Sequence, residues 1–187
     1  NLEEILDKEI KLLFIDDQFI NYDESIERLE KWISEGGTLV KFGGENFIKN
    51  IKSLSHQKLR SAFSLTGKKI SVEGNLSLKK SLKLLEISNE SPLFGLKVPA
   101  EIEIKEYVES SPSNFSRNIN VWLRLENGTP LISSVSQSKG QIIFFHIPCN
   151  TDWSNLTLSY FFVDILQKIV DQSKGIKLKE DRALKPF

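Results

Sequence analysis

The sequence predicts a three-layer α/β sandwich with a mainly parallel sheet and an antiparallel β insertion. A strand–helix–strand pattern in residues 11–42, and an apolar strand followed by an amphipathic helix in residues 141–171, predict the parallel part. Between about Leu65 and Val135 the apolar residues recur at every second position, which predicts the insertion.

The first unit is a βαβ crossover. Residues 11–15 form a short apolar stretch that predicts a buried strand, and residues 38–42 predict its parallel neighbour. Residues 22–35 between them predict an amphipathic helix that stops at a Gly-Gly pair. Its apolar face would consist of Ile26, Leu29, Trp32 and Ile33.

The insertion contains one sharp turn signal, Asn127-Gly128. This pair predicts a type I′ hairpin, because both central residues of that turn need a positive φ. Its arms would be Asn120 to Leu125 and Thr129 to Ser134. Residues 113–118 predict a polar, disordered loop.

The last third predicts the centre of the sheet. Gln141 to Ile147 is the most apolar strand and should be buried on both faces. A loop to Asn155 precedes a helix that should run to about Asp171. We expect one domain of residues 1–172, followed by a C-terminal tail or linker of residues 173–187. The helix would pack through Leu158, Phe161, Phe162, Ile165, Leu166, Ile169 and Val170.

Composition narrows the function. The 187 residues suffice for one domain, and 25 basic against 25 acidic residues remove the electrostatic reason to expect nucleic-acid binding. One cysteine excludes an internal disulfide framework and a multi-thiolate metal site. We expect no cofactor and no bound metal. The apolar runs are too short to cross a bilayer, and the absence of Met predicts a fragment of a longer protein.

Ligands of open α/β sheets bind at the carboxyl ends of the strands. Three such ends are predicted here: the first at Asp16-Asp17, the second at Gly43-Gly44-Glu45 and the third at His146 to Asp152. The candidate ligand-binding residues of the first two ends are Asp16, Asp17, Gly43, Gly44 and Glu45. The paired aspartates suit either a divalent cation or a capping role, of which we favour capping. The glycines suit either an anion cradle or a tight strand-to-helix turn, and we favour the turn because the phosphate-loop Lys and Ser/Thr are missing.

The third strand end offers two further interpretations. Cys149 with His146 and Asp152 would make a thiol nucleophile with its base, but a buried His and an inert Cys explain the same residues. Asp152, Trp153 and Asn155 suit a helix cap, with Asp152 or Ser154 as the capping residue, or a sugar or peptide contact. Two alternative functions therefore stay open: a thiol-dependent hydrolase or amidotransferase-like enzyme that uses Cys149 and His146, and a carbohydrate-binding module that uses Trp153 or Trp122.

Residues 32–44 resemble the helix, Gly-Gly-Thr-Leu, strand and Gly unit of the class I glutamine amidotransferase-like superfamily, which includes the middle domain of certain β-galactosidases. Residues 91–96, 122–131 and 146–158 resemble uncharacterised bacterial membrane proteins, which carry an N-terminal double-transmembrane segment similar to that of aerotolerance regulators. The resemblance covers most of residues 10–170 and implies an amidotransferase-like or flavodoxin-like sheet, with one βα unit of that fold preceding Leu2.

In active relatives the nucleophilic Cys sits at the turn after a central strand. Gly43 and Gly44 occupy that turn here, and the His-x-Glu spacing of the later strand is absent around His146. The resemblance therefore implies a scaffold that is not an enzyme, tethered at the inner membrane with the domain in the periplasm. Its expected partners are other domains of the parent chain or proteins of a membrane complex.

Overall fold

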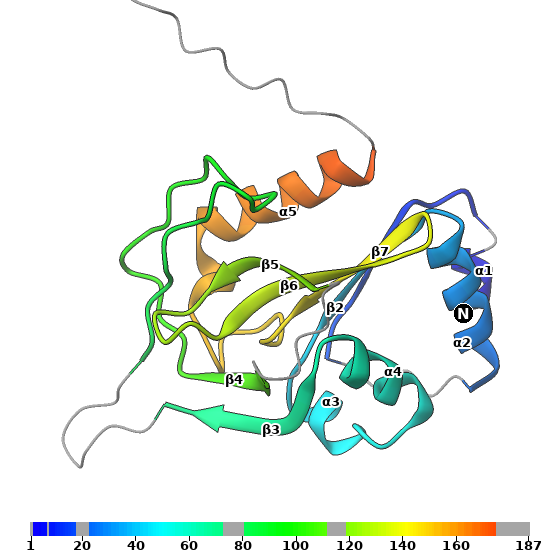
Figure 1. Cartoon of the computed structure of the whole chain (residues 1–187), viewed down its shortest axis with the longest axis horizontal. Coiled ribbons are helices and arrows are strands. Elements are labelled where there is room, and N and C mark those ends of the chain that lie inside the picture. Colours follow the sequence, from blue (N-terminus) through cyan, green and yellow to red (C-terminus); the bar gives the residue numbers. More distant parts are fainter. Residues whose placement is uncertain (1, 7, 18–22, 73–80, 112–118, 175–187) are drawn as a thin grey trace, which may run out of the picture.

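The computed structural model describes residues 2–6, 8–17, 23–72, 81–111 and 119–174. A five-stranded sheet runs through the molecule in the order β1-β2-β7-β6-β5 (Figure 1). β1, β2 and β7 are parallel neighbours, whereas β6 pairs antiparallel with both β7 and β5. The strands are β1 Leu12–Ile15, β2 Thr38–Phe42, β5 Ile119–Arg124, β6 Pro130–Gln137 and β7 Gly140–Phe145. The mainly parallel α/β architecture is thus confirmed.

Helices and a small second sheet cover the five-stranded sheet. α5 lies on one side, and α3, α4 and the antiparallel pair β3–β4 lie on the other (Figure 1). The bounds are α1 Leu2–Leu6, α2 Asp23–Ser34, α3 Glu45–Lys49, α4 Leu54–Ala62, β3 Leu65–Ser71, β4 Glu106–Ser110, a 3₁₀ turn Leu156–Leu158 and α5 Tyr160–Ser173.

Two consecutive phenylalanines of β7 show why this strand lies at the centre. Successive strand residues point to opposite faces. Phe145 stacks on Phe42 with ring centroids 4.5 Å apart and meets Phe162 of α5, while Phe144 packs against Phe47 of α3. The four consecutive apolar residues at positions 142–145 therefore supply both packing layers, as the sequence predicts.

The predicted insertion contributes to both sheets. β3 and β4 form the separate pair, whereas β5 and β6 extend the main sheet, because β6 pairs along the length of β7. The predicted hairpin joins β5 to β6, but its turn is not type I′. Only Gly128 has a positive φ (84°), and the N–H of Leu125 donates to the carbonyl of Thr129. This is a three-residue loop with glycine in the left-handed position.

Two further local predictions were wrong. β1 is a half-buried edge strand of the described sheet, with Phe14 41 % exposed, because only β2 pairs with it there. Leu158 is 76 % exposed and precedes the helix, since α5 begins at Tyr160 with the Ser159 hydroxyl accepting the N–H of Phe162 at 3.1 Å. The predicted loop at residues 113–118 and the tail from residue 175 lie outside the described residues.

Candidate functional site

The three predicted strand ends meet at one edge of the sheet, because β1, β2 and β7 are parallel and in register. The N–H of Gly43 donates to the carbonyl of Phe145 at 2.9 Å, which joins the second end to the third. The N–H of Cys149 donates to the Asp16 carboxylate at 3.1 Å, which joins the third to the first. We call this edge the strand-end junction: Asp16, Asp17, Lys41, Gly43, Gly44 and Cys149.

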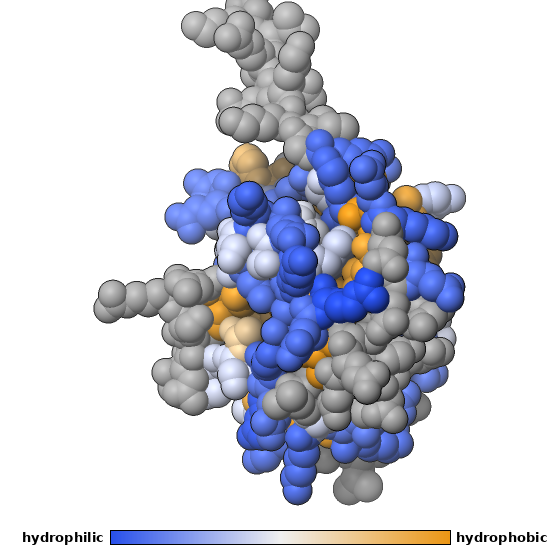
Figure 2. Space-filling model, turned by 90° about the vertical axis from the view of Figure 1, so that its right-hand side faces the viewer, coloured by the Kyte–Doolittle hydropathy of each residue, from blue (hydrophilic) through white to orange (hydrophobic). Residues whose placement is uncertain are grey.

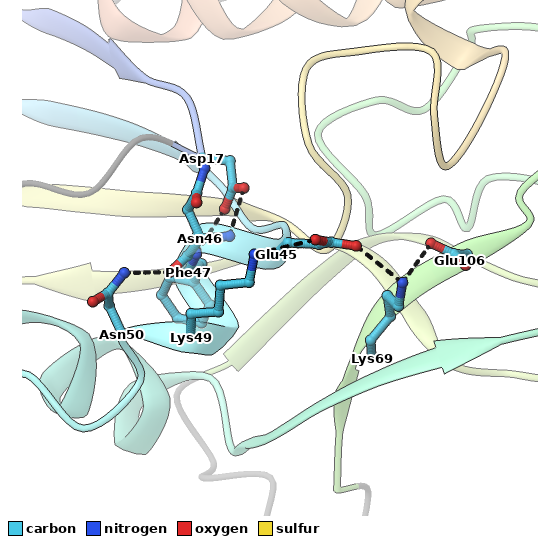
Figure 3. Close-up of polar contacts among 8 residues, drawn as sticks. All are labelled: Asp17, Glu45, Asn46, Phe47, Lys49, Asn50, Lys69 and Glu106. Atoms are coloured by element: carbon cyan, nitrogen blue, oxygen red, sulfur yellow. Dashed lines mark hydrogen bonds and ion pairs between the residues drawn. The ribbon is translucent and has the colours of Figure 1, made fainter.

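Asp17 closes the centre of the junction. Its two carboxylate oxygens accept the N–H groups of Asn46 at 2.9 Å and Phe47 at 2.8 Å, at the start of α3 (Figure 3). These main-chain donors would otherwise point outward from the helix terminus. The capping interpretation of Asp17 therefore agrees with the structure, although the capped helix lies 29 residues further along the chain.

The two glycines of the junction leave no space for a side chain. A Cβ atom on Gly44 would lie 2.6 Å from the Asp17 Oδ2 atom and 3.0 Å from the Cβ of Pro148. A Cβ atom on Gly43 would lie 2.6 Å from the Phe144 ring. The main chain thus forms a tight strand-to-helix turn, and its first amide donors are already satisfied by a carboxylate.

Replacing Gly44 with alanine should lower the free energy of unfolding by about 2 kcal/mol, because the new methyl group must displace a carboxylate held by two hydrogen bonds. Chemical denaturation measures this change. The matched experiment repeats the substitution in an Asp17→Ala background, where the methyl group has room and the loss should shrink. Equal losses in both backgrounds would show that Gly44 and Asp17 are not in contact.

Lys41 is a residue of the junction that the sequence analysis did not single out. Its side chain is only 2 % exposed, and its ammonium group donates to the carbonyls of Asp16 and Phe42, the latter at 2.9 Å. Burial lowers its pKa to about 8, and the nearby carboxylates of Asp17 and Asp16 act in the opposite direction. A lysine between apolar residues of a predicted buried strand was the available signal, since buried lysines occur only with partners.

Lys41 should make stability depend on alkaline pH. A lysine whose pKa is lower in the folded than in the unfolded chain binds fewer protons when folded, so stability rises as pH increases from about 8 toward 10.5. The difference in unfolding free energy between the wild type and Lys41→Met, measured by denaturant titration at each pH, should therefore grow in favour of the wild type across this window. A difference that stays flat would contradict the burial of a titrating Lys41.

His146 lies behind the junction and does not face Cys149. Its Nδ1 atom lies 3.0 Å from the carbonyl of Val108, and its Nε2 atom lies 3.0 Å from the Ser133 hydroxyl. The carbonyl can only accept, so Nδ1 carries the proton and Nε2 accepts from Ser133. Burial lowers the pKa of His146 to about 4, so the ring is neutral at pH 7. Both ring nitrogens are therefore engaged within the core.

Cys149 is exposed, and its environment does not activate it. The sulfur is nevertheless partly shielded from water, which raises the pKa of the thiol, and the Asp16 carboxylate raises it further. A nucleophilic thiol needs the opposite shift. Asp152, the third member of the suggested triad, is also exposed, and its N–H donates to the side-chain oxygen of Asn150. The structure therefore does not assemble the three residues as a catalytic group.

The Asp152–Asn155 segment anchors the loop before β4. The Asn155 side chain accepts the N–H of Glu103 at 2.7 Å and donates to the carbonyl of Glu101 at 2.9 Å. Trp153 is 3 % exposed, and Trp122 is equally buried with its indole N–H donating to Ser134. Neither ring lies on the exposed face that carbohydrate binding would require. The predicted cap by Asp152 or Ser154 was wrong, because Ser159 caps α5.

Glu45 lies on the exposed rim of the junction in a chain of ion pairs (Figure 3). Lys69 lies 3.1 Å from both Glu45 and Glu106, and Lys49 lies 3.5 Å from Glu45. Hydrogen bonds and charge from Lys69 and Lys49 lower the pKa of Glu45. The pairs bridge α3 to β3 and β4, and each contributes little stability because it is exposed. Among the described residues, no group of three His, Cys, Asp or Glu side chains could hold a metal ion.

Known proteins resemble this fold without matching the sequence closely. No family model matches the chain, and no curated protein matches it. Cytoplasmic Protein STM3548 from Salmonella typhimurium superposes with a TM-score of 0.66 at 14% identity, over 92% of this chain and 74% of that one. The mmIFT52 N-terminal domain gives 0.58 at 12% identity, over 98% and 83%. At these identities the likeness shows the fold alone.

A β-galactosidase from Bacillus circulans sp. alkalophilus also contains this fold. It superposes with a TM-score of 0.57 at 13% identity, and the match covers 92% of this chain but only 24% of the enzyme. The chain is thus similar to one part of a much longer protein. The β-galactosidase likeness suggested by the sequence therefore holds at the level of fold.

Proposed function

We propose that this chain is a non-catalytic structural or interaction domain of a membrane-anchored bacterial protein. The observation that carries the proposal is the closed junction: the carboxylate of Asp17 accepts the amide donors of α3 and occupies the space that a side chain at position 44 would need. In the amidotransferase-like fold a nucleophile would stand at this turn. A site for acyl transfer needs a reactive side chain and free donors for the oxyanion, and here a glycine and a satisfied helix terminus replace them.

The membrane part of the proposal rests on the resemblance of residues 91–96, 122–131 and 146–158 to bacterial double-transmembrane proteins. In the described part of the chain, no helix is long and apolar enough to cross a membrane. The tether we propose belongs to another part of the parent protein, and the domain would face the periplasm.

Experiments on the parent protein in its native membrane test both the membrane anchorage and the non-catalytic interaction function. We expect it in the membrane fraction, with this domain open to protease added to the periplasmic side. A Cys149→Ser variant should capture the same partners as the wild type after cross-linking, and a variant lacking residues 1–172 should lose them. Glutamine hydrolysis by the wild type that disappears in Cys149→Ser would overturn the proposal, as would a cytoplasmic location.

A further inference from the structure

A broad groove lies at the opposite end of the sheet from the strand-end junction. It has a volume of about 1010 Å³ and is bordered by the amino ends of β1, β2 and β7, with contributions from α1, α2 and the end of α5. This end lies on the right in Figure 1, and Figure 2 views the molecule from that side, where hydrophilic side chains predominate. We call this hollow the lysine groove.

The charge of the lysine groove departs from that of the whole chain, which is balanced. The groove is lined by four lysines and two glutamates, namely Lys8, Lys11, Lys139, Lys174, Glu9 and Glu35. An adjoining hollow of about 240 Å³ shares Leu6, Trp32 and Glu35 and adds the basic residues Arg28 and Lys31. Lys31 pairs with Glu35 at 3.9 Å, so the excess of positive charge comes from the four lysines of the groove itself, which outnumber its two glutamates and make this surface attractive to anions.

The middle of the lysine groove is built from small residues and one aromatic ring. A Cβ atom on Gly37 would lie 2.5 Å from the Trp32 ring, and one on Gly140 would lie 2.0 Å from the carbonyl oxygen of Ile33. The Trp32 indole N–H donates to the carbonyl of Ile10 at 3.0 Å. These contacts fix the backbone at Gly37 and Gly140 and the Trp32 ring in place.

The main-chain amides bordering the groove are engaged within the fold. The N–H of Gly37 donates to the carbonyl of Trp32 at 3.0 Å, and the N–H of Gln141 donates to the carbonyl of Gly37 at 3.2 Å. A compact phosphate site would use such amides as a nest of donors. Because these amides are already engaged, a ligand of the groove would be bound by the lysine ammonium groups instead. These are point charges on flexible side chains, which suits a ligand with several negative charges spread along it.

We propose that the lysine groove binds an extended acidic peptide segment of a partner protein. The inference rests on the proposed interaction function and names the chemistry of the partner. The hollow shape favours a chain over a membrane, because a flat bilayer would touch the rim and leave the middle of the groove empty. Acidic side chains would meet the lysines, and the peptide would lie along Trp32 and the serine hydroxyls of Ser136 and Ser138.

Fluorescence anisotropy with a labelled octaglutamate peptide tests the inference on the full chain. We expect binding at low salt that weakens steeply at 0.3 M salt, and at least tenfold weaker binding by the Lys11→Glu/Lys139→Glu double variant. The control is Lys52→Glu/Lys97→Glu, which makes the same charge change at exposed lysines that do not line the groove. It should bind like the wild type, and circular dichroism confirms that all variants are folded.

Three results would overturn the inference: no binding by the wild type, equal weakening in both double variants, or binding of anionic phosphatidylglycerol vesicles without binding of the peptide. Inorganic phosphate should displace the peptide no better than sodium chloride of equal ionic strength, and stronger displacement would indicate a compact phosphate site instead. If the peptide does not bind but the parent protein still captures partners independently of Cys149, this inference is wrong and the proposed function remains supported.

Discussion

Replacing Asp17 with alanine will lower the free energy of unfolding by about 3 kcal/mol. The substitution removes the acceptor of the N–H groups of Asn46 and Phe47 and withdraws a negative charge from the buried ammonium group of Lys41. Loss of a helix cap alone costs about 1 kcal/mol, and the lost attraction between the Asp17 carboxylate and the buried ammonium group costs about 2 kcal/mol more. Denaturation in urea, monitored by circular dichroism, measures the change.

Two variants make this experiment specific. Asp17→Asn keeps one carbonyl oxygen for the helix but removes the charge, so its loss should be intermediate. Asp16→Ala removes the neighbouring carboxylate, which is exposed and accepts the N–H of Cys149. This substitution should lower the free energy of unfolding by less than about 1 kcal/mol. If Asp17→Ala and Asp16→Ala proved equally stable, Asp17 would stabilise the junction no more than its exposed neighbour does.

Acidification from pH 6.5 to pH 4 will remove about 3 kcal/mol of stability through His146. Its pKa is about 4 in the folded chain against 6.5 for a free imidazole, so the unfolded chain binds more protons in this window and stability falls with pH. The shift arises because the ring is buried, with its two nitrogens facing Val108 and Ser133.

Carboxylates also titrate in this range, so the His146→Gln variant serves as the reference. The gap in unfolding free energy between the wild type and this variant should narrow by about 3 kcal/mol between pH 6.5 and pH 4. NMR of the wild-type imidazole supplies a second readout, since the ring should be half protonated near pH 4 rather than near pH 6.5. A ring that titrates near 6.5 would mean that His146 is open to solvent, as a catalytic base would be.

The local periodicity of the chain predicted most of its strands and helices, but not how the β insertion divides. Residues 38–42 and 141–147 contain adjacent apolar residues, at positions 39–40 and 142–145, and such runs are typical of strands buried on both faces. Strand alternation alone does not reveal the neighbour of a strand, so β5 and β6 looked like an insertion although they complete the main sheet.

The junction was predictable in its parts but not in its connections. Short-range rules identified Asp16, Asp17 and the glycine turn, because each follows a strand. The pairing of Asp17 with a helix 29 residues later is a tertiary contact without a local signal. The lysine within a predicted buried strand was a local signal, but it did not reveal the carbonyls of Asp16 and Phe42 that accept from Lys41. His146 illustrates the same limit, since its ring nitrogens are taken by Val108 and Ser133, which come from other strands.

The central claim is that this edge of the sheet holds no activated nucleophile, and alkylation of Cys149 tests it most directly because the chain has a single cysteine. We predict that iodoacetamide modifies the native chain at pH 7 more slowly than it modifies free cysteine, and that the rate rises only as the pH passes the raised pKa of the thiol. An alkylation rate of the native chain at least tenfold above that of free cysteine, and lost in His146→Gln, would show that Cys149 is an activated nucleophile.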